Sequence, residues 1–157
     1  MSENKRFQLV AWTEGKNVKM IPSAREEVFK QFLDRITYVE SQEDKISDID
    51  FCMELSQAYE SYAMALLRCG YVREALRQMV NAGSAAIPNE DRYWYYINDE
   101  PKGSWGIDNP FKGRFFSVYS SCKQLITRNP ELKAEFLSLK QAARWGIITD
   151  WWERTNF

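Results

Sequence analysis

Of the residue types that most often act in catalysis or bind metals, this sequence lacks histidine and has few cysteines. The chain has 157 residues and no histidine. Catalysis by Ser-His-Asp or Cys-His groups, ligation of zinc or haem by imidazole and a histidine pH switch are therefore excluded for this chain. Its three cysteines, Cys52, Cys69 and Cys122, are odd in number and far apart. That spacing predicts reduced thiols rather than a disulfide framework or a CxxC site.

Other patterns of catalytic or ligand-binding residues are weak. Neighbouring acids such as Glu26 and Glu27 lie at an expected helix start, where the helix dipole favours negative charge without any catalysis. The run Gly103-Ser-Trp-Gly106 lacks the spacing of a phosphate-binding loop, and no EF-hand calcium loop is present. We therefore expect a non-enzymatic protein without a cofactor or a metal.

The charge is almost balanced overall but not along the chain. The net charge is -1, so no global field favours nucleic acid or a membrane surface. Residues 26–61 contain ten acids and three bases, whereas residues 102–144 contain eight bases and three acids. These two regions are either two solvated faces or a bipolar surface that helps to select a partner.

The basic region 102–144 offers an alternative function. It places cations close to aromatic rings in the sequence, a mixture that can stack bases and contact phosphates. The residues concerned are Lys112, Arg114, Lys123 and Arg128, with Trp105, Phe111, Phe115 and Tyr119. A small regulatory or nucleic-acid-associated protein is therefore the alternative hypothesis, although the balanced total charge makes nucleic acid the weaker prediction.

Helical periodicity predicts the elements that carry these residues. The pattern Ser23-Ala-Arg-Glu26 resembles a capping box, and apolar residues then recur at helical spacing as far as Val39. A second helix is expected from Ser47 to the stop at Gly70, with Ile49 among its inward residues, and a third from about Val72 to before Pro88. Helical signals resume at residue 115 and stop before residue 130. The last helix follows, with its inward set running to Trp151.

Two segments are harder to assign. Residues 1–22 form either a small hairpin around Gly15 or an irregular N-terminal arm. Residues 89–114 are an aromatic-rich insertion, in which 98–114 is expected to be a long, packed loop. The whole chain is predicted to be one all-α domain of about five helices. It has no secretory signal and no apolar run of about 18 residues, so we expect a cytoplasmic protein that does not enter a membrane.

The second and third predicted helices carry a recognisable residue order. Large and small residues alternate at set positions, and a turn separates the two halves. The residues of the first half are Tyr59, Tyr62, Ala63 and Leu66, the turn is at Gly70, and the second half has Ala75, Met79 and Ala82, followed by Pro88. This order resembles the tetratricopeptide repeat, a helix-turn-helix unit of 34 residues. The resemblance covers 56–88 well, and a degenerate second unit follows from Trp94. It implies stacked antiparallel hairpins in which three alanines bring two helix backbones close together.

The resemblance also implies where a partner would bind. In that family a peptide lies in a groove lined by the first helix of each pair. The corresponding candidates here are Gln57, Ser61, Met64 and Arg68, together with Tyr93 and Trp94. Trp151 and Trp152 are a second candidate surface, because adjacent residues on a helix point about 100° apart and both cannot enter one core. That surface is expected to bind a partner or to form a homodimer, or else one of the two rings caps the helix.

Overall fold

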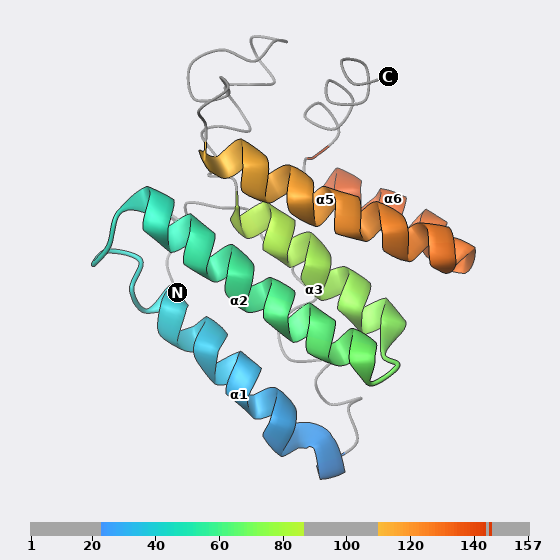
Figure 1. Ribbon diagram of the computed structural model, residues 1–157, viewed down its shortest axis with the longest axis horizontal. Helices are drawn as coiled ribbons and strands as arrows, with labels where there is room; N and C mark the ends of the chain where they lie inside the picture. Colours follow the sequence, from blue (N-terminus) through green and yellow to red (C-terminus); the bar gives the residue numbers. More distant parts are fainter. Residues whose placement is uncertain (1–22, 87–109, 144, 146–157) are drawn as a thin grey trace, which may run out of the picture.

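The computed structural model describes residues 23–86, 110–143 and 145, and these residues form five α-helices and one 3-10 turn without any strand (Figure 1). The elements are α1 (Ser23–Glu40), α2 (Asp48–Arg68), α3 (Val72–Ala85), α5 (Pro110–Arg128), η4 (Pro130–Leu132) and α6 (Lys133–Ala142). The predicted all-α class is therefore confirmed. The arm at 1–22 and most of the insertion at 89–114 lie outside the described residues.

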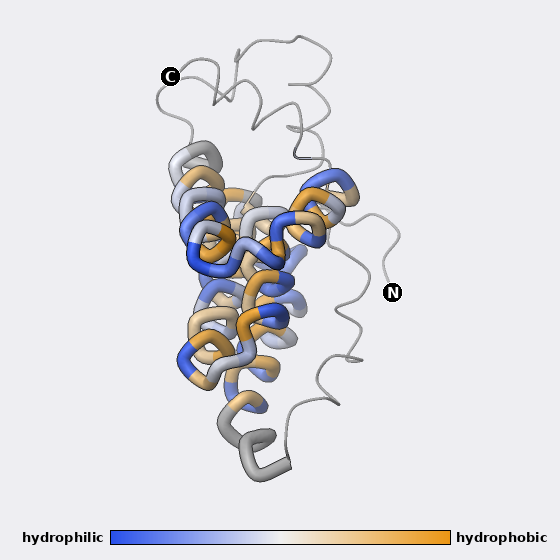
Figure 2. The backbone as a smooth tube through the Cα atoms, turned by 90° about the vertical axis from the view of Figure 1, so that its right-hand side faces the viewer, coloured by the Kyte–Doolittle hydropathy of each residue, from blue (hydrophilic) through white to orange (hydrophobic). Residues whose placement is uncertain are grey.

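Helix α3 lies at the centre of this arrangement. It packs against α2 on one side and against α5 and α6 on the other, while α1 packs on the far side of α2. Helix α5 also touches α2, so it lies across both helices of the α2–α3 hairpin. Figure 2 shows hydrophobic and hydrophilic residues interleaved along the helices, as expected of helices that each bury one face.

The α2–α3 hairpin has the ends that the sequence predicts. The Ser47 hydroxyl accepts a hydrogen bond from the backbone N–H of Asp50 at 3.1 Å, which caps the start of α2. Gly70 has a φ of +87° in the turn between the two helices, a conformation that residues with a Cβ rarely adopt. The backbone N–H of Tyr71 then bonds to the Leu66 carbonyl at 3.0 Å and closes the end of α2.

The three alanines predicted to join these helices are completely buried. Ala63, Ala75 and Ala82 have no exposed surface. At one of them the approach is directly visible, because the Ser56 hydroxyl of α2 donates a hydrogen bond to the Ala82 carbonyl of α3 at 2.7 Å. Small side chains at these positions allow the two backbones to lie close together. The predicted hairpin is therefore confirmed.

Three local predictions are wrong. Ile49 was expected to point inward, but it is 46% exposed because it lies on the outer face of the first turn of α2. Helix α5 begins at Pro110 rather than at Phe115, since proline is well tolerated at the first helical position, where its missing N–H is not needed. Helix α6 ends at Ala142 instead of continuing to Trp151. There the N–H of Trp145 bonds to the Lys140 carbonyl at 3.0 Å, and the indole is fully buried.

Candidate functional site

The outer face of α2 carries the four partner-binding candidates that lie within the described residues. Gln57, Ser61, Met64 and Arg68 follow one another at helical spacing, and all four are exposed to solvent. Met64 is 38% exposed, which makes it one of four exposed large apolar side chains among the described residues. The structure thus brings the four residues together on one accessible surface.

A groove runs beside this surface, between α1 and α2. It has a volume of about 390 Å³, which lies toward the small end of the range for ligand pockets. Gln57 and Ser61 line it, whereas Met64 and Arg68 lie outside it. The other lining residues are Gln31, Phe32 and Arg35 from α1 and Glu54 and Ala58 from α2. The sequence predicted only Gln57 and Ser61 of the α2 wall, and it predicted none of the α1 wall, because the residues of α1 give no signal of which helix they face.

The groove combines an aromatic floor with a charged rim. The ring of Phe32 is stacked on that of Tyr62, with centroids 6.4 Å apart and an angle of 21° between the planes. Across the groove, the Arg35 guanidinium lies 3.6 Å from the Glu54 carboxylate, and both side chains are about half exposed. This arrangement suits an apolar side chain with a polar or charged neighbour.

The hydroxyl of Tyr62, beneath Phe32, is buried without a hydrogen-bond partner among the described residues. Burial raises the pKa of this phenol well above its usual range, and the nearby Glu74 carboxylate raises the pKa further. The hydroxyl is therefore protonated at neutral pH. The Tyr62 ring supports Phe32 from the core side of the groove.

A buried polar junction joins α2, α3 and α5. The Arg114 guanidinium of α5 donates to the Ser56 hydroxyl at 2.9 Å and also to the Glu60 carboxylate. Ser56 in turn donates to the Ala82 carbonyl of α3. The Arg114 and Glu60 side chains are only 16% and 26% exposed, so their charges are largely shielded from water. This junction was missed, because Arg114 was assigned to a solvent-facing basic region.

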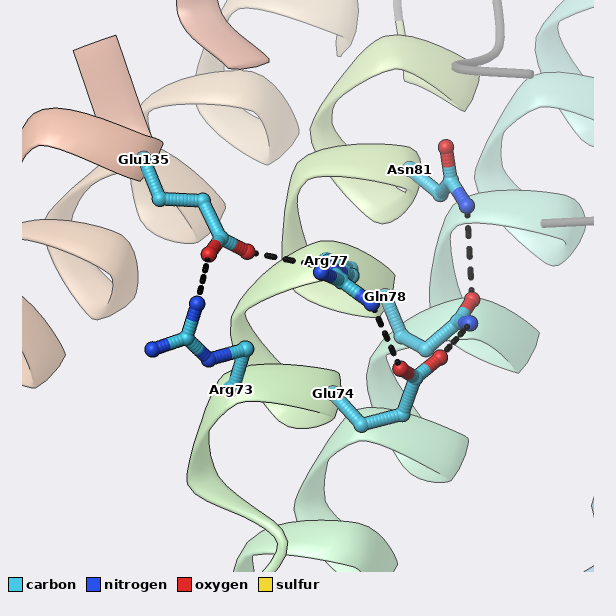
Figure 3. Close-up of polar contacts among 6 residues, drawn as sticks. All are labelled: Arg73, Glu74, Arg77, Gln78, Asn81 and Glu135. Atoms are coloured by element: carbon cyan, nitrogen blue, oxygen red, sulfur yellow. Dashed lines mark hydrogen bonds and ion pairs between the residues drawn. The ribbon is translucent and has the colours of Figure 1, made fainter. Parts of the chain in front are cut away.

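A second polar network connects α3 with α6 (Figure 3). The Glu135 carboxylate of α6 accepts hydrogen bonds from Arg73 at 2.6 Å and from Arg77 at 3.0 Å. Arg77 also reaches the Glu74 carboxylate at 3.4 Å. The chain of contacts then turns inward along α3, where Gln78 donates to Glu74 and the buried Asn81 donates to Gln78. The network fixes α6 relative to α3 and has a structural role.

Trp145 closes the core next to this network. Its indole N–H donates to the Ser84 hydroxyl at 3.2 Å, and its ring packs edge-on against Phe115 with centroids 4.9 Å apart. The six-membered ring lies directly over Gly83. A Cβ built at Gly83 would lie 2.5 Å from Cζ2 and 2.6 Å from Cη2 of the indole, so α3 needs a glycine there.

Among the described residues, the cations and the rings of the alternative, nucleic-acid hypothesis are not exposed together. Phe115 and Tyr119 are buried, and Arg114 is ion-paired with Glu60, while Lys123 and Arg128 are exposed. The Lys123 ammonium lies 5.6 Å from the centre of the Tyr119 ring. Buried rings cannot stack on bases, so Phe115 and Tyr119 offer no stacking surface beside the exposed cations. Trp105 and the side chains of Phe111 and Lys112 lie outside the described residues.

Four of the predicted partner-binding residues, Tyr93, Trp94, Trp151 and Trp152, also lie outside the described residues, as does Pro88. Among the residues that the structure describes, no three histidine, cysteine, aspartate or glutamate side chains gather as they would around a metal ion. In the same part of the chain, none of the helices combines the length and the apolar character that crossing a membrane requires. Comparisons with protein-family models, with curated proteins and with solved structures find no match.

Proposed function

We propose that this protein is a non-enzymatic interaction module that binds a protein or peptide segment on the outer face of α2 and in the groove between α1 and α2. One observation carries this proposal. The four α2 residues that the sequence predicts as a binding face are all exposed on the same side of the helix. Two of them, Gln57 and Ser61, line a groove with an aromatic floor. An apolar side chain of the partner fits this groove, and the polar rim orients the peptide around it.

The arrangement of helices supports a repeat-like interpretation of the same surface. Helix α5 packs against both helices of the α2–α3 hairpin, and α6 packs against α3. In stacked helical hairpins, each new hairpin packs on its neighbour in this way. We infer that α2–α3 and α5–α6 are two tetratricopeptide-like units, with α1 covering one end. The second unit in this interpretation begins at Pro110, so the insertion separates it from the first.

The test is selection of peptides against the folded full chain from a phage-displayed random library. Binding of the selected peptides is then measured by fluorescence anisotropy. Ser61→Trp fills the groove and is expected to weaken binding about tenfold or more, which corresponds to about 1.4 kcal/mol. Ser138→Trp places the same ring on an exposed position of α6 and is expected to leave binding unchanged.

Two results contradict the proposal. In the first, no peptide is enriched above a control selection without protein. In the second, the selected peptides bind Ser61→Trp as tightly as they bind the wild type. Circular dichroism of both variants checks that the helices are intact, because the two positions are exposed and neither substitution changes the core.

A further inference from the structure

The groove between α1 and α2 lies in the most acidic part of the chain. Residues 26–61, which supply both of its walls, contain ten acids and three bases. In this segment the described acids that are exposed or half-exposed are Asp34, Glu40, Glu43, Asp44, Asp50, Glu54 and Glu60, and the bases are Lys30, Arg35 and Lys45. Asp34 is paired with Lys30, and Glu60 is paired with Arg114 of α5. At ordinary ionic strength, charges within about 10 Å of one another still interact, so this excess produces a negative potential around the groove.

The cation within the groove is already balanced. Arg35 lies 3.6 Å from the Glu54 carboxylate. Both side chains are about half exposed, and an exposed ion pair contributes little, about 0–1 kcal/mol. A cation of a partner can therefore join or replace Arg35 beside Glu54 at small cost. A carboxylate of a partner would have to displace Glu54 and enter a negative potential.

The uncharged part of the groove defines the rest of the partner. Phe32 and Ala58 offer apolar surface, and Gln31, Gln57 and Ser61 offer amide and hydroxyl groups around it. A volume of about 390 Å³ accommodates one or two side chains and not a folded domain. The groove therefore fits a short segment that has an apolar residue next to a cation.

We propose that the occupant of this groove is a basic peptide segment of a partner protein, in which an apolar side chain packs on Phe32 and a neighbouring lysine or arginine pairs with Glu54. This inference rests on the proposed function, and it adds the chemistry of the partner. The acids at the end of the groove near residues 40–50 attract further cations of the segment and align it along α2.

The test uses three fluorescein-labelled peptides of one length: a lysine–leucine peptide, a glutamine–leucine peptide and a glutamate–leucine peptide. The lysine–leucine peptide is expected to bind most tightly and to lose affinity as salt is raised. Two variants at one exposed groove position separate charge from shape. Ser61→Glu is expected to strengthen binding of this peptide, and Ser61→Arg to weaken it, each by about two- to fivefold. Ser138→Glu and Ser138→Arg on α6 are matched controls with no expected effect.

Several outcomes overturn the inference without affecting the proposed function. One is that the glutamate–leucine or the glutamine–leucine peptide binds more tightly than the lysine–leucine peptide, and that this binding is lost in Ser61→Trp. Another is binding of the lysine–leucine peptide with the same affinity in Ser61→Glu and Ser61→Arg. A third is self-association in sedimentation equilibrium that is weakened by Ser61→Arg, because the occupant is then a second copy of this chain. If none of the peptides, selected or designed, responds to Ser61→Trp, the proposed function itself is wrong.

Discussion

The contact between Gly83 and Trp145 allows a sharp test of the core. Changing Gly83 to alanine adds one methyl group, which would lie 2.5 Å from Cζ2 and 2.6 Å from Cη2 of the indole. Those distances are far below van der Waals contact, so α3 or the indole must move. Overpacking of this kind typically costs about 1–3 kcal/mol. Alanine is the better helix former by about 1 kcal/mol, which offsets part of that cost.

We therefore expect Gly83→Ala to lower the free energy of unfolding by up to about 2 kcal/mol, the overpacking cost less the gain in helix propensity. Gly113 in α5 is the matched control, because a Cβ there would have no atom within 4 Å. Gly113→Ala is expected to raise the stability by up to about 1 kcal/mol. Urea denaturation followed by circular dichroism measures both changes.

A double-mutant cycle identifies the indole as the cause of the loss. Trp145→Leu removes the ring that the new methyl group would meet, so Gly83→Ala is expected to cost less in that background than in the wild type. The reasoning is refuted if Gly83→Ala stabilises the protein as much as Gly113→Ala does. It is equally refuted if the cost of Gly83→Ala is the same with and without the indole.

Three further predictions follow from buried polar groups. Arg114→Ala leaves the largely buried Glu60 carboxylate without this partner and is expected to cost about 1–3 kcal/mol. Adding Glu60→Gln to Arg114→Ala is expected to recover part of that loss in urea denaturation. Tyr62→Phe removes a buried hydroxyl that has no hydrogen-bond partner in the described part of the chain, so the unfolding free energy is expected to stay the same or to rise. A loss above about 1 kcal/mol would show that the hydroxyl is bonded. Burial raises the pKa of the Cys122 thiol well above its usual range. Ellman's reagent is therefore expected to react quickly with the exposed Cys69, and to react with Cys122 only after unfolding. Rapid reaction of all three thiols in the native protein would contradict this.

The sequence was most informative where the structure depends on neighbouring residues. The cap at Ser47, the stop at Gly70 and the alanine spacing of α2 and α3 lie within one hairpin. Local chemistry determines such features, because a hydroxyl reaches its own helix start and a glycine relieves strain at its own turn. The outer face of α2 was predictable for the same reason, since the buried face of a helix fixes its exposed one.

Contacts between distant parts of the chain could not be predicted in the same way. Arg114 is separated from Ser56 by 58 residues, and no periodic pattern connects them. From the sequence, a single arginine among other bases has the same appearance whether it faces solvent or a buried acid. The α1 wall of the groove was missed for a related reason. Phe32 reads as an ordinary core residue, although the structure places it partly in the core and partly in the groove.

The central position of α3 has a consequence for how this protein can be divided. Of the twelve residues from 75 to 86, every residue except Arg77 is buried, and the helix contacts α2, α5 and α6 at once. Neither the α2–α3 hairpin nor the α5–α6 hairpin therefore has a complete hydrophobic core of its own. Excising residues 110–157 would expose one flank of α3 and leave the Arg73 and Arg77 guanidiniums without Glu135. We therefore expect the two hairpins to unfold together as one cooperative unit.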